Sequence, residues 1–270
     1  MKKILVTGAG GFVGSYLVNN FVAESYQVYA GYRSKKDKIK NRDNVKTFKL
    51  NLPDISTLPK DYDFLIHCGA DTSATTDNKD KMNESNNKGT KELFDYSASI
   101  GVKKIIYLSS MSIYGKITDR LLTETYQPNE PDFYGYSKYL GEKYLGLISK
   151  KYNIDSLSIR LPGIVGIGSK NNFLSNLIPN ILNRKKIIIN NSNPDELFNN
   201  IIYINNLKKY IFYYLENTFK NYNIVNIAAS EPMPLRKLIL STYDAFDIQK
   251  NIYFKESKKN NFVISIKKIQ

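Results

Sequence analysis

A serine, a tyrosine and a lysine stand at spacings that suit proton transfer. Ser110 follows the apolar stretch 105–108, which is typical of a buried strand, and Tyr134 and Lys138 open a later helix. Residues four apart share one helical face, so we expect Lys138 beside Tyr134. An ammonium group there would lower the pKa of the phenol, which lets Tyr134 exchange a proton with a substrate hydroxyl or carbonyl. Ser110 would hydrogen-bond to the same substrate oxygen, so these three residues are the predicted catalytic set.

The spacing Y-x-x-x-K alone is weak evidence in a chain so rich in tyrosine and lysine. It also occurs at Tyr32–Lys36, in a loop, and at Tyr139–Lys143, on the same helix as Tyr134. The second pair is turned by about 140° from Tyr134, taking about 100° per residue, and therefore faces elsewhere. The alternative for Tyr134 and Lys138 is an ordinary surface pair. The serine-bearing strand end upstream favours the catalytic interpretation.

A glycine-rich turn follows the first apolar stretch, in Thr7-Gly8-Ala9-Gly10-Gly11-Phe12-Val13-Gly14. Gly8 permits a sharp strand-to-helix turn, and Gly11 lets a pyrophosphate approach the backbone. Gly14 lets the helix pack closely on the strand. The pyrophosphate would meet free N–H groups at the start of the helix. This context predicts a dinucleotide site, the alternative being a tight turn without a ligand.

The end of the second predicted strand indicates which dinucleotide binds. An acidic residue about 20 residues after the glycines usually holds the ribose 2′-hydroxyl of NAD, whereas the 2′-phosphate of NADP needs a cation. This chain has Gly31-Tyr32-Arg33-Ser34-Lys35-Lys36 there, with no carboxylate. Arg33 suits a phosphate through its planar fork. NADP(H) is therefore favoured, NAD is possible, and solvated loop cations are the alternative.

Apolar stretches alternate with helical patterns along the first part of the chain. This alternation predicts an α/β fold, a Rossmann doubly wound and mostly parallel sheet, over residues 1–166. A small C-terminal substrate-binding lobe is expected over 167–270, with segments that return to the Rossmann core. The expected strands are 4–6, 28–30, 45–50, 64–67, 105–108, 156–161, 187–189 and 222–228, and the expected helices run to about Ala23 and to about Gly101, then over 134–149, 173–182, 207–215 and 235–246.

Bulk composition limits the partners. The net charge is +14, but the lysines are scattered and no groove-reading motif accompanies them, so we expect no nucleic acid. The single cysteine, Cys68, excludes an internal disulfide and fits a cytoplasmic protein, and without a second thiol or a histidine cluster nearby no metal is expected. No apolar run reaches membrane-spanning length. His67 ends a predicted strand, which favours a structural role over catalysis.

Together these motifs form an ordered set. It comprises the glycine turn, His67-Cys68-Gly69-Ala70, Asn86-Asn87-Lys88-Gly89-Thr90, Ser109-Ser110 with Tyr114-Gly115, and Tyr134-Gly135-Tyr136-Ser137-Lys138. The chain thereby resembles the NAD(P)-dependent epimerase/dehydratase family, the extended short-chain dehydrogenases that act mainly on nucleotide-activated sugars. The resemblance implies a homodimer formed through the helices that precede and follow the strand at 105–108. It places Thr72, Ser110 and Tyr134 toward a nucleotide-sugar substrate, and it implies that the cofactor is lined by Phe12, Val13, Asn51, Leu52, Cys68, Gly69, Ala70, Asn86, Tyr134, Lys138 and Pro162.

Several positions depart from the family pattern. Sugar dehydratases of this family carry an Asp-Glu pair where this chain has Met111 and Ser112, so dehydration is not expected. Gly163 replaces an asparagine, and Asn199 stands where the family often has a pyrophosphate-binding arginine. Lys170, Arg184 or Lys185 could substitute as substrate anchors.

Three functions follow as hypotheses. The first is an NADP(H)-dependent oxidoreductase that reduces a keto group of a nucleotide-activated deoxysugar, with Tyr134 as general acid and base. The second is a nucleotide-sugar epimerase that retains its NAD(P) tightly. The third is a non-catalytic NADP-binding regulator, because fold alone does not fix function.

Overall fold

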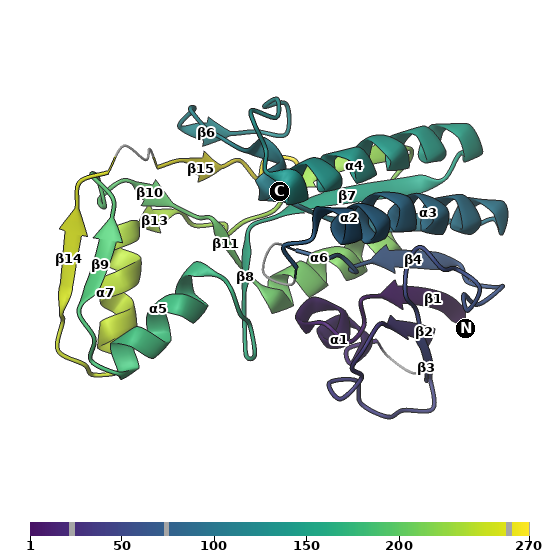
Figure 1. Cartoon of the computed structure of the whole chain (residues 1–270), viewed down its shortest axis with the longest axis horizontal. Helices are drawn as coiled ribbons and strands as arrows, with labels where there is room; N and C mark the ends of the chain where they lie inside the picture. The colour runs from purple at the N-terminus through teal and green to yellow at the C-terminus, as the bar shows by residue number, and fades with distance from the viewer. Residues whose placement is uncertain (22–24, 73–75, 258–260, 270) are drawn as a thin grey trace. The chain divides into compact units, whose positions relative to one another are not determined.

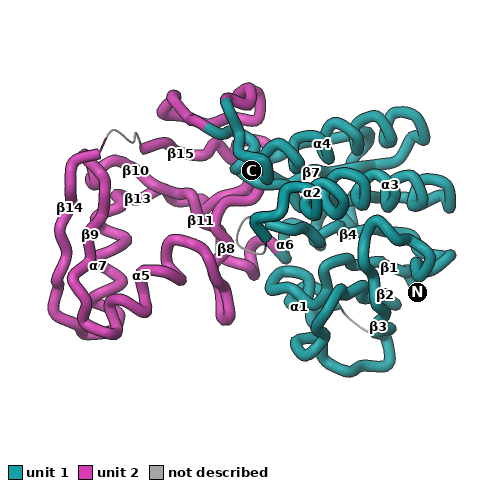
Figure 2. Tube along the Cα trace, viewed as in Figure 1, with its two compact units in different colours: residues 1–115, 130–160, 208–225 teal, residues 116–129, 161–207, 226–270 magenta. Residues whose placement is uncertain are grey.

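The structure is a computed structural model that describes residues 1–21, 25–72, 76–257 and 261–269. It divides into two compact units (Figure 2). Unit 1 comprises residues 1–115, 130–160 and 208–225, and unit 2 comprises 116–129, 161–207 and 226–270. These bounds differ from the predicted boundary at residue 166, because the chain crosses between the units several times.

A seven-stranded sheet forms the centre of unit 1 (Figure 1). In the ladders that place Ile4 opposite Val28 and Phe64, the strands run parallel. The strand order reverses on either side of β1, which marks a topological switch point between β1 and β4. The order confirms the predicted Rossmann-like α/β fold and runs β3 (Val45–Lys49), β2 (Tyr26–Tyr32), β1 (Lys2–Thr7), β4 (Phe64–His67), β5 (Lys104–Ser110), β7 (Asp155–Leu161), β12 (Tyr222–Asn226).

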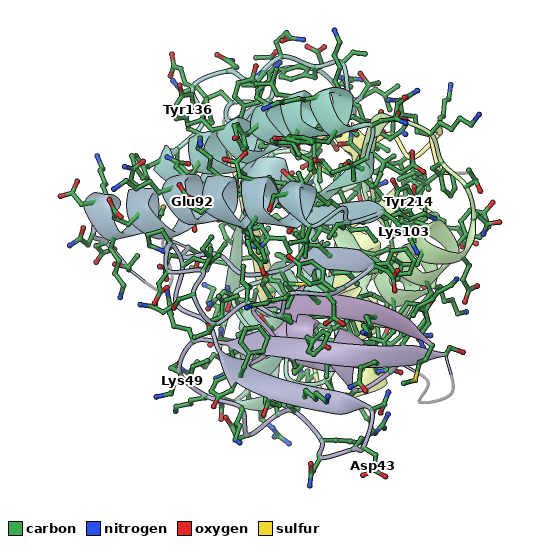
Figure 3. All side chains as sticks on the ribbon, turned by 90° about the vertical axis from the view of Figure 1, so that its right-hand side faces the viewer. Asp43, Lys49, Glu92, Lys103, Tyr136 and Tyr214 are labelled. Carbon is green, nitrogen blue, oxygen red and sulfur yellow. The ribbon has the colours of Figure 1, made fainter. Side chains whose placement is uncertain are left out.

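The strands are apolar because helices cover the sheet. Ile4, Leu5 and Val6 in β1 are fully buried, as expected for parallel strands that lie inside a layered fold. Helices α3 (Gly89–Ser99) and α4 (Phe133–Tyr152) lie side by side over one part of it, with Glu92 and Tyr136 projecting outward (Figures 1 and 3). The remaining helical segments of this part of the chain are α1 (Phe12–Val18), α2 (Lys79–Met82), the π-helix η1 (Asn83–Lys88), the 3₁₀-helix η2 (Met111–Tyr114) and α6 (Ile204–Glu216). The predicted end of the first helix near Ala23 lies outside the described residues.

A lysine in β5 closes the end of α6. The Nζ atom of Lys104 donates to the carbonyl oxygens of Tyr214 and Leu215 at 3.0 and 3.1 Å, and also to that of Asn217. A helix leaves its last carbonyl groups without partners inside the helix, and a cation satisfies them well. Lys104 therefore attaches the C-terminal end of α6 to strand β5 of the main sheet.

Unit 2 is built from short strand pairs and two helices. Its apolar cluster includes Leu177, Ile181, Ile239 and Tyr243. The helices α5 (Phe173–Leu182) and α7 (Leu235–Ala245) match the predicted ones, whereas most strand pairs were not predicted. The pairs are β6 (Leu121–Leu122) with β15 (Val263–Ile264), β8 (Gly163–Val165) with β11 (Ile201–Tyr203), β9 (Ile187–Asn190) with β14 (Ile252–Lys255), and β10 (Leu197–Phe198) with β13 (Met233–Pro234). Among the described residues, no helix has the length and hydropathy needed to cross a bilayer.

Candidate active site

The first turn of α4 packs against the turn that follows β5. Asp132 caps α4 by accepting a hydrogen bond from the Gly135 N–H at 2.7 Å. A Cβ atom at Gly135 would lie 2.1 Å from the Ser112 carbonyl oxygen, so only glycine allows this approach. The approach places Tyr134 near Ser110 at the end of β5, close enough for the serine hydroxyl to lower the pKa of the phenol. The structure thus brings together the serine and tyrosine predicted from sequence.

Lys138 completes the predicted set from within the fold. Its side chain is 2% exposed, and Nζ donates to the Leu108 carbonyl oxygen at 2.8 Å. The same Nζ lies 4.5 Å from the ring centroid of Tyr107 and 6.0 Å from that of Tyr134. Burial lowers the pKa of Lys138 to about 8, and the nearby Cys68 and Glu142 oppose that shift. The lysine therefore titrates close to physiological pH.

The expected depression of the Tyr134 pKa is wrong for this structure. Burial raises the pKa of Tyr134 to about 12, and the hydrogen bond with Ser110 opposes the rise. Desolvation disfavours the phenolate more than the neighbouring groups stabilise it. Lys138 is engaged by Leu108 instead of the phenol. Tyr134 is therefore a neutral phenol at neutral pH and is equipped to donate a proton.

Burial keeps two further titratable side chains neutral: His67, the last residue of β4, and Cys68, which follows it. His67 Nδ1 lies 2.7 Å from Thr7 Oγ1, and Nε2 lies 3.0 Å from Thr90 Oγ1. Burial lowers the pKa of His67 to about 3 and raises the pKa of Cys68 to about 12. The imidazole thus joins β1 to α3 as a neutral ring, in agreement with the expected structural role. No group of three potential metal-binding side chains occurs in the parts of the chain that the structure describes.

The glycine turn has the close backbone contacts expected of a dinucleotide site. Gly8 has φ +64, and a Cβ atom there would lie 2.7 Å from the backbone N of Gly69. A Cβ at Gly14 would lie 2.3 Å from the Gly8 oxygen, whereas at Gly11 the nearest atom is 3.2 Å away. Packing therefore requires glycine at positions 8 and 14, and the constraint at Gly11 is weaker, since an added Cβ would meet only the Gly8 oxygen at 3.2 Å.

Gly10 is a packing position that the glycine spacing does not predict. Its Cβ would lie 2.0 Å from the Lys35 carbonyl oxygen, so the glycine turn fits directly under the loop that follows β2. The two segments that the sequence predicts to bind the cofactor are therefore in contact. Spacing alone could not reveal this contact, because Gly10 lies outside the three-glycine pattern.

The residues that the resemblance assigns to the cofactor come from several strand ends. Most follow β1, β3 and β4, and Asn86 lies in η1. Leu52 packs at Gly89 of α3, where an added Cβ would lie 2.5 Å from its own Cβ. Pro162 follows β7 and belongs to unit 2. The segments concerned are Phe12 and Val13 at the start of α1, Asn51 and Leu52 after β3, and Cys68, Gly69, Ala70 and Thr72 after β4. The assigned residues of unit 1 thus lie at the strand ends that surround the glycine turn.

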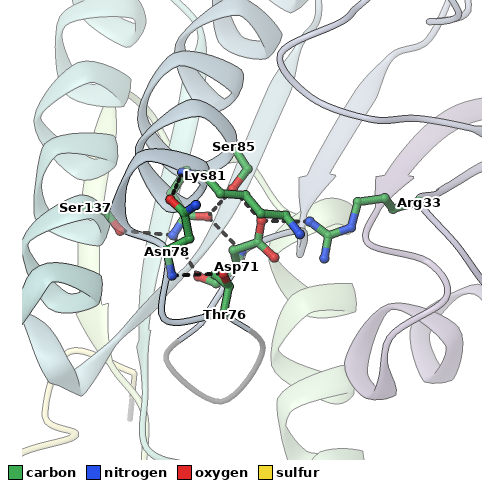
Figure 4. Close-up of polar contacts among 8 residues, drawn as sticks. Arg33, Asp71, Thr76, Asn78, Lys81, Ser85 and Ser137 are labelled. Carbon is green, nitrogen blue, oxygen red and sulfur yellow. Dashed lines mark hydrogen bonds and ion pairs between the residues drawn. The ribbon is translucent and has the colours of Figure 1, made fainter.

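Arg33 has a protein partner that the sequence analysis did not foresee. Its Nη1 atom lies 2.7 Å from Oδ2 of Asp71, whose side chain is 1% exposed (Figure 4). The hydrogen bond and charge of Asp71 raise the pKa of Arg33 against the effect of burial. Asp71 lies four residues beyond β4, and no motif marked it.

A buried ion pair links β7 to the helix that carries Tyr134. Arg160, at the end of β7, contacts both carboxylate oxygens of Glu142 on α4, the shortest contact being 2.7 Å. Its Nη1 also donates to the hydroxyl of Tyr114 at 2.8 Å. Tyr114 belongs to η2, the turn that begins after Ser110. The arginine therefore fixes the turn and the helix that carry the predicted catalytic residues Ser110 and Tyr134.

The structure shows what the side chains contact at three positions that depart from the family pattern: Met111, Ser112 and Asn199. Met111 is buried and Ser112 interacts with Ser110, its Oγ lying 3.2 Å from the Ser110 Oγ. Asn199 is 2% exposed and hydrogen-bonds both backbone groups of Ile264, accepting from N–H at 2.8 Å and donating to the carbonyl at 3.0 Å. The amide that replaces the arginine of the family thus stabilises the β6–β15 region of unit 2.

Comparison with known proteins decides the family. The model of the NAD dependent epimerase/dehydratase family matches residues 4–228. The chain belongs to this family. Its members are extended short-chain dehydrogenases and NAD(P)-dependent enzymes.

Individual relatives agree in fold. A UDP-glucose 4-epimerase from Vibrio cholerae is 32% identical over 186 residues, which are 64% of this chain and 55% of that protein. The chain thus spans about half the length of that relative. Two solved structures share the fold, both at 21% identity. The UDP-glucuronic acid 4-epimerase from Bacillus cereus in complex with NAD has a TM-score of 0.85, covering 99% of this chain and 90% of the other, and the UDP-N-acetylglucosamine 4-epimerase from Methanobrevibacter ruminantium M1 has 0.83, covering 98% and 88%.

Proposed function

We propose that this family member is an NADP(H)-dependent oxidoreductase that reduces a keto group on a nucleotide-activated sugar. The observation that carries the proposal is the close packing of the first turn of α4 on the turn after β5, which brings Tyr134 near Ser110, with the buried Lys138 Nζ 6.0 Å from the Tyr134 ring. A neutral phenol suits the reductive direction, in which a proton must be delivered to the substrate oxygen. The solved relatives with UDP-sugars support the substrate class.

The proposed reaction divides the chemistry between cofactor and chain. A dinucleotide held over the glycine turn would supply the hydride that reduces the carbonyl carbon. Tyr134 donates its proton to the oxygen, and the Ser110 hydroxyl orients that oxygen. Lys138, which titrates near pH 8, stabilises the tyrosinate that remains until solvent returns the proton. The net change is one ketone reduced to an alcohol and one NADPH oxidised.

Arg33 supports NADP over NAD in this proposal. It follows β2, where the adenosine ribose lies in this fold, and no carboxylate ends that strand. A carboxylate there would repel a 2′-phosphate, whereas a guanidinium would bind it. The NAD seen with the Bacillus cereus relative leaves NAD as the competing cofactor to be measured.

Turnover of Tyr134→Phe tests the proposed chemistry. NADPH oxidation at 340 nm with 4-keto nucleotide sugars should fall by about 10²- to 10⁴-fold. Tyr139→Phe is the matched control, because Tyr139 has the same Y-x-x-x-K spacing on the same helix and lies on a different face. Equal rates for the two variants would remove Tyr134 from the mechanism. No oxidation by the unaltered chain with any such sugar would remove keto reduction.

A nucleotide-sugar epimerase is the second candidate, because the relatives with matching folds are named as 4-epimerases. An epimerase oxidises and re-reduces the same carbon, so it keeps its dinucleotide through the cycle. A reductase must exchange it at every turnover. Denaturing release followed by chromatography therefore separates the two: stoichiometric bound NAD favours the epimerase, and a chain that purifies without dinucleotide favours the reductase.

A homodimer through α3 and α4 remains part of the proposal. Leu147 and Tyr152 on α4 are 65% and 42% exposed, as a helix that pairs with a second copy requires. Light scattering after size-exclusion chromatography measures the mass. Leu147→Glu should shift a dimer toward the monomer, and a monomeric unaltered chain would contradict the proposal.

A further inference from the structure

The Arg33–Asp71 pair crosses the end of β1. Arg33 directly follows β2 and Asp71 follows β4, and β1 lies between these two strands in the sheet. Neighbouring strands are about 4.8 Å apart, so the pair spans two strand intervals. The glycine turn leaves β1 at this same edge. The guanidinium therefore points toward the centre of the sheet, away from the loop after β2 (Figure 4).

Asp71 is the fixed member of the pair. Its backbone N–H donates to Oδ1 of Asn86 and its carbonyl accepts from Nδ2 of Asn86, both at 2.8 Å. Asn86 also donates to Ser137 Oγ on α4 at 3.1 Å, which ties the segment to the catalytic helix. The carboxylate accepts from Ser85 Oγ at 2.8 Å. A buried residue held at the backbone and at the side chain cannot follow a moving partner.

Arg33 is the member that can change partner. Its side chain is 44% exposed against 1% for Asp71, and it has several rotatable bonds. A guanidinium carries five N–H donors, so one contact to Asp71 does not exhaust it. To reach a 2′-phosphate beyond the end of β2, however, it must turn away from β4. The buried carboxylate would then lose the guanidinium contact and keep Ser85 and the charge of Lys81, an exchange that is unfavourable in a site of low polarity.

We propose that Asp71 determines the discrimination between NADP and NAD by competing with the 2′-phosphate for Arg33. This inference rests on the proposed dinucleotide-dependent function. Asp71 acts as an internal anion that the 2′-phosphate has to replace, so it weakens NADP binding and speeds NADP release. NAD has a hydroxyl at that position, so it can bind while Arg33 stays paired with Asp71. Asp71 is thus a specificity-determining residue that touches the cofactor only through Arg33.

The test is a set of binding measurements on Asp71→Asn. Asparagine has nearly the same shape and can still accept from Ser85, but it carries no charge. NADPH binding, followed by the emission of the reduced nicotinamide, should tighten about tenfold, within the range measured for coupled neighbours. NADH binding should stay unchanged. 2′,5′-ADP against 5′-AMP, measured by calorimetry, repeats the comparison without the nicotinamide half and without turnover.

Two further variants secure the interpretation. In Arg33→Ala/Asp71→Asn the gain should vanish, because no guanidinium is left to be released; this variant also removes the pair without leaving a buried charge. Arg236→Ala/Asp195→Asn is the matched control, since it removes another Arg–Asp pair with a 2.7 Å contact, on the surface of unit 2. Thermal melting of each variant verifies folding.

The outcomes separate this inference from the function on which it rests. Tighter NADPH binding by Asp71→Asn that depends on Arg33 supports competition. Weaker NADPH binding would mean that Asp71 orients Arg33 toward the phosphate, and an equal change for NADPH and NADH would mean no role in discrimination; either overturns the proposal while leaving the oxidoreductase intact. Failure of the unaltered chain to bind any dinucleotide overturns both.

Discussion

Glu142→Gln should destabilise the protein strongly, because it leaves the Arg160 guanidinium buried beside a neutral partner. Glu142 and Arg160 are 1% and 4% exposed. Burial by itself lowers the pKa of Arg160, and the contacts with Glu142 and Tyr114 reverse that effect and raise it. This reversal shows how far the cation depends on its carboxylate.

The expected size follows from burial. Removing one partner of a buried pair typically reduces the free energy of unfolding by about 3–5 kcal/mol. The total for a folded protein is about 5–15 kcal/mol, so a large share would be lost, and the melting temperature should fall by roughly 10 °C. Urea denaturation followed by circular dichroism measures the change.

A surface pair of similar geometry provides the control. Arg236 Nε lies 2.7 Å from Asp195 Oδ1, but the two side chains are 41% and 64% exposed. Asp195→Asn should therefore change the free energy of unfolding by less than about 1 kcal/mol. The double replacement Glu142→Leu/Arg160→Met, which removes both charges, should be more stable than Glu142→Gln. Equal losses for Glu142→Gln and Asp195→Asn would refute the argument from burial.

Two more predictions concern the glycine turn and the buried lysine. Gly10→Ala should lower the free energy of unfolding by about 1–3 kcal/mol, because its Cβ would lie 2.0 Å from the Lys35 oxygen. Gly11→Ala should melt nearer the unaltered chain yet bind NADPH roughly tenfold more weakly, about 1.4 kcal/mol; the same behaviour for both in melting and calorimetry would contradict the separate roles. Folding lowers the pKa of Lys138 from 10.5 to about 8, so below pH 8 both states hold the proton, and above it the unfolded state holds more. The free energy of unfolding should therefore rise between pH 8 and 9.5, by up to about 1.4 kcal/mol per unit. Urea titrations should show this rise in Lys143→Met but not in Lys138→Met, and a rise that survives in Lys138→Met would assign it to another group.

The features that were predicted correctly are those that short stretches of sequence determine by themselves. Apolar runs located the strands of the main sheet, because parallel strands are buried on both faces. Tyr134 and Lys138 are four residues apart, and helix geometry fixes their relation without any knowledge of the fold. Gly8 and Gly14 were assigned packing roles that the close contacts confirm.

The remaining features depend on contacts between distant segments. Arg33 and Asp71 are 38 positions apart, and the residues around one contain no pattern that predicts contact with the other. The Tyr134 pKa depends on how deeply the whole fold buries the phenol, so spacing gave the wrong direction. Strands of two or three residues in unit 2, such as 121–122 and 263–264, are too short to produce a periodic signal.

The route of the chain through the sheet has a practical consequence. β12, the outer neighbour of β7, and the helix end fastened by Lys104 both lie in residues 208–225, after the chain has passed through most of unit 2. A fragment cut at residue 166 would lack both, and its last strand would present a bare row of N–H and C=O groups. Such a row recruits other chains. The Rossmann-like unit therefore cannot be excised by a single cut, and a fragment made that way should precipitate.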